Sequence, residues 1–324
     1  MSDYFAAVDL GGTKIAAAIA TGDGEFVIED KVPTNSHEGP ESVLERISET
    51  INRLASESGK KPAAVGLGVP GLVDLPTGAT KFLPNLPTKW RDVPAGETIA
   101  GKVGCPVHLL NDVRTITLGE LTFGHGRDEP VKTMAYFALG TGVGGGLVID
   151  GKLRLGPLGA AGELGHQTII ADGHLCGCGN RGCLETLCSG PSISSEGVRM
   201  LKSGLAPKLY EIVDGDPEHV TPREMAEAAA QGDENVVDAI QRAGMYLGIG
   251  IANIATAIHP ELVVIGGGVA NIGDILLKPV RESFAKRVRM FPADSVRIER
   301  SKLGGRAALY GGLALAMKGG YANV

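Results

Sequence analysis

The sequence predicts an α/β protein built from two related lobes. Short apolar segments that end in glycine or polar residues alternate with longer segments of helical periodicity, which is the pattern of an α/β fold. A strand, a glycine–threonine turn, a strand, a glycine turn and a strand open the chain, and the same order recurs after residue 133. Such repetition predicts two lobes of similar design, and 324 residues are enough for both.

The first region is predicted to form a meander of three strands followed by an amphipathic helix. We expect the strands at residues 5–9, 15–20 and 26–27. The turn Gly11-Gly12-Thr13-Lys14 lies between two strands, whereas a dinucleotide fingerprint or a Walker loop needs a helix after the turn. Lys14 is therefore not a Walker lysine. Pro40 opens the helix, and apolar side chains repeat at helical spacing as far as Leu54.

The remaining elements follow from the same two periodicities. We expect strands at 64–69, 107–110, 133–139, 147–149, 152–153, 262–265 and 296–300, and helices at 113–121, 272–288 and 307–317. A capping box at Thr221–Glu224 introduces a helical region that runs to Ile258. Three glycines inside it, Gly244, Gly248 and Gly250, predict that this helix packs very close to a neighbour.

Composition excludes several classes of partner. The net charge is −6 and lysines and arginines are scattered, which argues against nucleic acid or an anionic membrane. The N-terminus shows no secretory signal, and the longest apolar segment, residues 245–258, is too short to span a bilayer. Five cysteines in such a chain fit a reducing compartment, so we expect a cytoplasmic protein.

Glycine-rich turns after buried strands predict a nucleotide site. Gly11-Gly12-Thr13 and Gly140-Thr141-Gly142 are the repeated pair, and a glycine triplet at 266–268 follows a third strand. Backbone N–H groups freed by glycine can point at phosphate oxygens, and threonine hydroxyls add donors. Asp9, just before the first turn, is placed either to bind Mg²⁺ or to cap the turn.

The dipeptide Asn111-Asp112 places a carboxylate at the end of an apolar strand. A kinase that acts on a hydroxyl group needs such a base to orient the nucleophile and accept its proton. The dipeptide alone is also typical of a plain turn.

A cluster of cysteines predicts a structural metal site. Cys176, Cys178 and Cys183 follow His166 and His174, and three thiolates with one imidazole are a common ligand set for tetrahedral zinc. The spacing does not choose between the two histidines. The competing interpretation is a set of unrelated buried thiols.

The motifs DLGGTK, LGTGVGGG, GELGH and CGCGNRGCLE, in this order over essentially the whole chain, resemble the ROK family of bacterial sugar kinases and repressors. The resemblance implies the actin-like, ribonuclease H-like ATPase fold, with the active site between two lobes. We accordingly expect a smaller lobe at 1–115, a larger lobe with the zinc motif at 116–305, and a C-terminal helix at about 306–324 that packs back on the smaller lobe.

The resemblance also implies a role for each motif residue. Asp112 would be the general base. The ATP phosphates, with Mg²⁺, would lie against Asp9, Gly11, Gly12, Thr13, Lys14, Gly140, Thr141 and Gly142, and the adenosine near Gly267 and Gly268. Sugar hydroxyls would bind Asn85, Asn111, Asp112, Glu163, His166 and Glu185. A structural Zn²⁺ would be held by His166, Cys176, Cys178 and Cys183.

The activity implied is ATP-dependent phosphorylation of a hexose, with glucose at its 6-hydroxyl the best match to the GELGH motif, Asn85 and the complete cysteine motif. Related members act on fructose, mannose, N-acetylglucosamine or N-acetylmannosamine. ROK repressors carry a DNA-binding helix-turn-helix before the kinase-like body, and here the first phosphate strand begins at about residue 4. A sugar-binding module without catalysis would be expected to lack Asp112 or a phosphate turn. The family resemblance also implies a homodimer or a higher homo-oligomer.

Overall fold

The computed structural model describes residues 3–83, 86–87 and 90–324, and it confirms the α/β prediction. The chain forms two compact units, each discontinuous in sequence. Unit 1 comprises Met1–Lys132, Gly146–Gly162 and Ser301–Val324, and unit 2 comprises Thr133–Gly145 and Glu163–Arg300.

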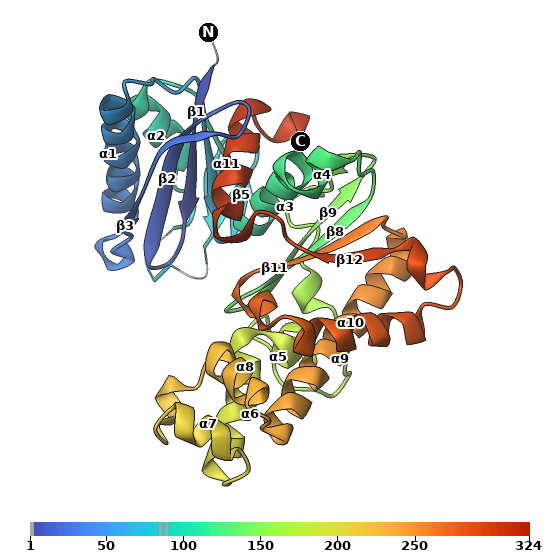
Figure 1. Ribbon diagram of the computed structural model, residues 1–324. Coiled ribbons are helices and arrows are strands. Elements are labelled where there is room, and N and C mark those ends of the chain that lie inside the picture. Colours follow the sequence, from blue (N-terminus) through green and yellow to red (C-terminus); the bar gives the residue numbers. More distant parts are fainter. Residues whose placement is uncertain (1–2, 84–85, 88–89) are drawn as a thin grey trace. The chain divides into compact units, whose positions relative to one another are not determined.

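The secondary structure follows the predicted order (Figure 1). The strands are β1 (Tyr4–Leu10), β2 (Lys14–Thr21), β3 (Phe26–Pro33), β4 (Val65–Val69), β5 (Leu72–Asp74), β6 (Ala79–Phe82), β7 (Val107–Asn111), β8 (Met134–Leu139), β9 (Val143–Ile149), β10 (Lys152–Leu153), β11 (Leu262–Gly266) and β12 (Arg297–Arg300). The helices are α1 (Pro40–Ser58), α2 (Ala95–Val103), α3 (Asp112–Phe123), α4 (His125–Asp128), α5 (Glu185–Cys188), α6 (Gly190–Lys202), α7 (Pro207–Ile212), α8 (Pro222–Ala230), α9 (Glu234–Ile258), α10 (Asp274–Arg287) and α11 (Ala307–Met317).

The sheet of unit 1 places two predicted site segments at one edge. Its strand order is β3-β2-β1-β4-β7, with β1, β4 and β7 parallel. In this register Asp9 lies opposite Gly68, and Asn111 lies opposite Val69. Because parallel strands end at the same edge of a sheet, Asp9 and Asn111 both lie at the carboxyl edge, with β4 between their strands. Ligands bind at this edge in open α/β sheets.

Helices cover both faces of this sheet. On one face α1 and α2 bury Ile47, Ile51 and Ile99 against the strands. On the other face α11 packs on β1 and β4 (Figure 1). This contact is so close that a Cβ atom on Gly66 of β4 would lie 1.9 Å from the carbonyl oxygen of Gly312. Only glycine at position 66 allows α11 to approach the strand this closely.

The second sheet has the order β10-β9-β8-β11-β12, with β8, β11 and β12 parallel. Within unit 2, α9 and α10 run side by side (Figure 1). A Cβ atom on Gly244 would lie 2.4 Å from the carbonyl oxygen of Leu276, and one on Gly248 would lie 2.5 Å from that of Val280. The predicted close packing of this helix is confirmed.

Between β4 and β7 no strand or helix was expected, and the structure has both. This region contains the β5–β6 hairpin and α2, which ends at Val103. Strands of three and four residues are too short to show a period, and two glycines in the nine residues of α2 dilute the helical signal. Asn85 lies outside the described residues. Among the residues described, no helix is long and apolar enough to cross a membrane.

Candidate active site and metal centre

Asn111 caps the helix that begins with Asp112. The Asn111 side-chain oxygen accepts hydrogen bonds from the backbone N–H groups of Val113 (3.0 Å) and Arg114 (3.2 Å), and its amide nitrogen donates to the carbonyl oxygen of Gly71 (3.2 Å). One oxygen of Asp112 accepts from the Val113 N–H at 2.8 Å. The dipeptide therefore forms a helix cap, and no separate turn lies between β7 and α3. The cap fixes the Asp112 carboxylate at the N-terminus of α3, where the helix dipole favours negative charge.

Asp9 and Asp112 form a pair of carboxylates at this edge. The pKa of Asp9 is raised from 3.8 to about 7, chiefly by burial and also by the negative charge of Asp112, while Lys31 acts in the opposite direction. Two neighbouring carboxylates with little solvent between them resist carrying full charge together. The same arrangement favours a cation, since a divalent ion bound there would relieve the repulsion.

The first glycine turn is a closed hairpin. The Gly11 N–H donates to the carbonyl oxygen of Lys14 at 3.0 Å. Thr34, which is fully buried, donates its hydroxyl to the Gly11 carbonyl oxygen (2.7 Å), and its N–H donates to that of Thr13 (2.9 Å). The turn is thus supported from beneath while Gly12, Thr13 and Lys14 are exposed.

The second glycine turn, in unit 2, rests on Glu185. The Gly140 N–H donates to the Gly142 carbonyl oxygen (2.9 Å), which closes the turn. The Val143 N–H donates to one carboxylate oxygen of Glu185 at 3.0 Å. A Cβ atom on Gly142 would lie 2.4 Å from the same oxygen, so the carboxylate fills the space under the turn.

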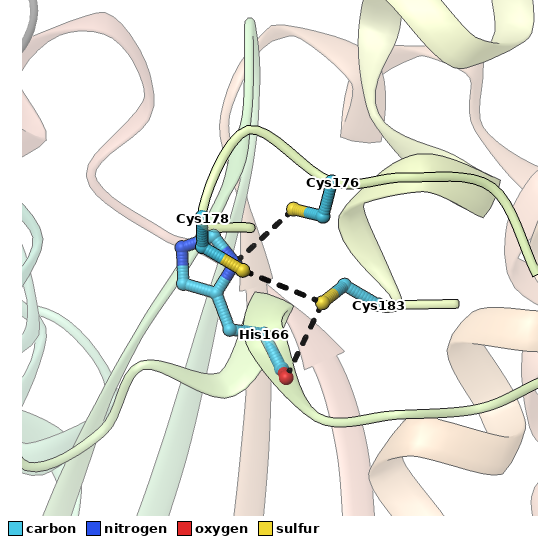
Figure 2. A group of neighbouring side chains, drawn as sticks. All are labelled: His166, Cys176, Cys178 and Cys183. Carbon is cyan, nitrogen blue, oxygen red and sulfur yellow. Dashed lines mark hydrogen bonds between the residues drawn. The ribbon is translucent and has the colours of Figure 1, made fainter. Parts of the chain in front are cut away.

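The cysteine motif brings four potential ligands together. The imidazole of His166 and the thiols of Cys176, Cys178 and Cys183 lie within 4.8 Å of one another (Figure 2). Cys178 Sγ lies 3.7 Å from Cys183 Sγ, and Cys176 Sγ lies 3.6 Å from His166 Nδ1. These spacings match the edges of a tetrahedron around zinc, which are roughly 3.8 Å for two thiolates and 3.6 Å for a thiolate and an imidazole.

The histidine at the cluster is His166, which the resemblance also implied. The ring nitrogen that faces the thiols is Nδ1 (Figure 2). Burial raises the pKa of the Cys183 thiol to about 12, whereas a hydrogen bond from the Asn180 N–H lowers that of Cys178. Packing three thiols side by side without a cation is unfavourable for the thiolate forms, and a divalent cation would stabilise them.

Glu185 also borders the cysteine cluster. Its second carboxylate oxygen lies 3.7 Å from Cys176 Sγ. One side chain therefore contacts both the glycine turn and the cluster. Glu163 lies just before the short helical turn that carries His166, whose N–H donates to the Glu163 carbonyl oxygen at 3.1 Å.

The two glycines after β11 differ from each other. Gly267 has a φ of 87°, and a Cβ atom there would lie 2.2 Å from the Leu139 carbonyl oxygen, so the fold itself requires glycine. Gly268 is exposed, and a Cβ atom there would meet nothing within 4 Å. Packing within the described residues does not account for glycine at 268, which fits close approach of a ligand.

The geometry thus gathers the predicted residues in two groups. In unit 1 the group is Asp9, Asn111 and Asp112 with the first turn. In unit 2 it is the second turn, Glu185 and the cysteine cluster. Sequence reasoning missed the supports: Thr34 under the first turn, the Glu185 contact with Val143, and the buried Arg114 beside Asn111. For Arg114 the available signal in the sequence was a charged residue two positions after Asp112.

Comparison with known proteins places this arrangement in a family. The model of the ROK family matches residues 5–319. The chain belongs to the ROK family. A glucokinase of Halalkalibacterium halodurans is 37% identical over 322 residues, which cover 96% of this chain and 94% of that protein. A xylose repressor of Caldicellulosiruptor bescii is 31% identical over 96% of this chain and 77% of the repressor.

Solved ROK structures share the fold. The crystal structure of a ROK family glucokinase from Streptomyces griseus, in complex with glucose and AMPPNP, superposes with a TM-score of 0.82. It is 33% identical, and the match covers 97% of this chain and 99% of that one. The actin-like ATPase fold expected for a ROK protein thus agrees with the α/β architecture described above.

Proposed function

We propose that this ROK protein is an ATP-dependent hexose kinase that phosphorylates glucose at the 6-hydroxyl. The observation that carries the proposal is the Asp112 carboxylate, held at the carboxyl edge of the sheet and within electrostatic reach of Asp9. Extensive similarity to glucokinases, and to a structure in complex with glucose and AMPPNP, supports ATP and a hexose as substrates.

In this proposal Asp112 accepts the proton of the sugar hydroxyl as its oxygen attacks the γ-phosphorus of ATP in line. The Val113 N–H holds one carboxylate oxygen, and the Asn111 cap fixes the start of the helix. A base fixed in this way contributes mainly through orientation, which is how kinases lower the barrier of phosphoryl transfer.

The phosphates of ATP would contact backbone N–H groups of the two glycine turns, residues 11–14 and 140–142. Both turns are closed by internal hydrogen bonds and supported from beneath, so they need little reorganisation to bind a charged group. Asp9 would hold the Mg²⁺ that accompanies ATP, directly or through water. Gly267 and Gly268 would lie near the adenosine.

The sugar hydroxyls would contact Asn85, Asn111, Asp112, Glu163, His166 and Glu185. The side-chain oxygen of Asn111 already accepts three N–H donors, so Asn111 would offer the sugar the second N–H of its amide. His166 would use Nδ1 for the metal and Nε2 for a sugar oxygen. The metal would then fix the orientation of the ring.

The cysteine cluster fits Zn²⁺ in donor type, number and spacing. Zinc held by four protein side chains has no open position for water or substrate, so the ion would stabilise the fold around Glu163, His166 and Glu185. We further propose that the expected lobes at 1–115 and 116–305 close over the substrates and exclude water. We also propose that the protein is cytoplasmic and forms a homodimer or a higher homo-oligomer.

A coupled ADP-release assay tests this function. Glucose, mannose, fructose, N-acetylglucosamine and N-acetylmannosamine would be compared, and glucose should give the highest kcat/KM. If another hexose gave the highest kcat/KM, the proposed substrate would be wrong and the proposed kinase activity would stand. The similarity to xylose repressors supports a sugar-sensing regulator as the second candidate. Sugar binding without any ADP release would favour that candidate and overturn the kinase.

A further inference from the structure

Arg114 is a buried arginine two residues beyond Asp112. Its side chain is 2% exposed, among the most completely buried large side chains of the described residues. Arginine is almost never buried to this degree unless its donors are satisfied. The position in the first turn of α3 places its guanidinium beside Asn111.

Three atoms of the guanidinium make separate hydrogen bonds. Nε donates to the carbonyl oxygen of Ala161 at 3.0 Å, and Nη2 donates to that of Ala160 at 3.1 Å. Nη1 donates to the side-chain oxygen of Asn111 at 3.1 Å. The rigid planar fork of arginine suits such a set, whereas lysine offers one nitrogen and cannot reproduce it.

The hydrogen bond from Arg114 to Asn111 stabilises the N-terminal cap of α3. The Asn111 oxygen receives the Arg114 side chain together with the backbone N–H groups of Val113 and Arg114. The orientation of Asn111 sets the first turn of the helix, and with it the peptide whose N–H holds Asp112. Arg114 therefore acts on Asp112 through the cap.

The other two hydrogen bonds of Arg114 go to a glycine-rich loop, residues 155–162. Residues 155–162 contain three glycines in the left-handed region, at φ of 70°, 70° and 94° for Gly156, Gly159 and Gly162. Such a backbone has much conformational entropy to lose. The two carbonyl groups bound by Arg114 come immediately before Gly162, and the chain then continues into Glu163.

We propose that Arg114 is a positioning residue for the phosphoryl transfer, which links the segment leading into Glu163 to the cap that orients Asp112. This inference rests on the proposed kinase function. In the absence of sugar, the Arg114 guanidinium would hold the orientation of Asp112, through Asn111, and the position of the backbone that leads into Glu163. Its loss should raise the KM for the hexose more than that for ATP, because the three hydrogen bonds described above go to Asn111 and to the backbone before Glu163.

The test compares Arg114→Gln and Arg114→Lys with Arg281→Gln. Arg281 also donates to a backbone carbonyl oxygen, that of Ile298 at 3.1 Å, but it lies in unit 2 on α10. Both Arg114 variants should lose roughly 10- to 100-fold in kcat/KM for the hexose, the scale of a small misplacement of reacting groups. The KM for ATP should change less than about twofold. Arg281→Gln should keep the kinetic constants of the wild type.

Equal losses for hexose and ATP, or wild-type kinetics in Arg114→Lys, would overturn the inference, since a purely structural arginine predicts one or the other. If Arg114→Gln fails to fold, Arg114→Lys alone is tested, by the same comparison of kcat/KM for the hexose with the KM for ATP. Amide hydrogen exchange needs no turnover and separates this inference from the kinase proposal. Amides of residues 159–163 and 112–115 should exchange faster in the Arg114 variants than in Arg281→Gln. Unchanged exchange there contradicts the positioning role, whereas a wild-type protein inactive on every hexose contradicts the kinase.

Discussion

The carboxylate of Glu185 accepts a hydrogen bond from the Val143 backbone N–H at 3.0 Å, while its other oxygen lies 3.7 Å from Cys176 Sγ. A residue predicted only as a sugar ligand thus also supports the second glycine turn. The cysteine cluster and the second glycine turn share one side chain in unit 2.

Replacing Glu185 should separate its two roles. Glu185→Gln keeps an oxygen that can accept from Val143, so we expect a higher KM for the hexose and a nearly unchanged KM for ATP. Glu185→Ala leaves that N–H without its acceptor, and the KM for ATP should rise roughly 5- to 100-fold, equivalent to about 1–3 kcal/mol. Steady-state kinetics with each substrate varied gives the answer. Equal ATP constants in both variants would show that the contact is irrelevant to the nucleotide.

The two glycines of the second turn form a matched pair. Gly142→Ala places a methyl group against the Glu185 carboxylate and should lower the Tm, whereas Gly140→Ala meets no atom within 4 Å and should leave it unchanged. If Gly140→Ala nevertheless weakens ATP binding in calorimetry, the turn contacts the nucleotide. Equal melting temperatures for the two variants would contradict the packing described for Glu185.

Asp112→Asn should remove the proposed general base while keeping nearly the same side-chain shape. We expect kcat to fall by about 10²- to 10⁴-fold, the usual contribution of a general base. Hexose binding, measured by calorimetry without ATP, should remain largely intact. A variant with near-normal turnover would show that another group takes the proton.

The cysteine cluster predicts zinc in the purified protein. Cys178→Ser should release the metal and lower the Tm, because a lost ligand leaves the remaining thiols without a cation. Cys105→Ser is the control, since Cys105 is a half-buried free cysteine outside the cluster. Elemental analysis and thermal melts decide the matter. An intact protein that contains no zinc would rule out this metal site.

The raised pKa of Asp9 makes stability depend on pH. The folded protein holds the Asp9 proton with a pKa of about 7 against 3.8 for an ordinary aspartate. The stabilising contribution is therefore complete below about pH 4 and is lost as the pH rises to about 7. Asp9→Asn avoids the loss, so its free energy of unfolding should exceed that of the wild type above pH 7, by at most about 4 kcal/mol, and the difference should shrink toward pH 4.

Asp30→Asn provides the opposite sign for comparison, since a hydrogen bond from Arg53 lowers the pKa of Asp30. Denaturant unfolding at pH 5, 6, 7 and 8 would follow both variants. A constant difference between Asp9→Asn and the wild type over this range would mean that Asp9 is charged in the folded protein throughout.

The sequence predicted long periodic elements well, but it did not predict the side-chain contacts that hold the site residues in place. Helix α11 was expected at its observed bounds, Ala307–Met317, because its apolar run is uninterrupted. Helix α2 was missed, since its contacts with the strands are invisible without the fold. Asp9 and Asp112 could be placed at one edge because Asp9 lies near the end of one strand and Asp112 directly follows another. Arg114 could not, because its partners at Ala160 and Ala161 lie more than forty residues away.

The contact between Gly66 and Gly312 has a consequence for the order of synthesis. In unit 1, α11 completes one face of the sheet, but all of unit 2 lies between it and strands β1 and β4 in the sequence. The strands are therefore synthesised well before the helix that covers them. A nascent chain that is stopped before residue 307 would expose the apolar face of β1 and β4.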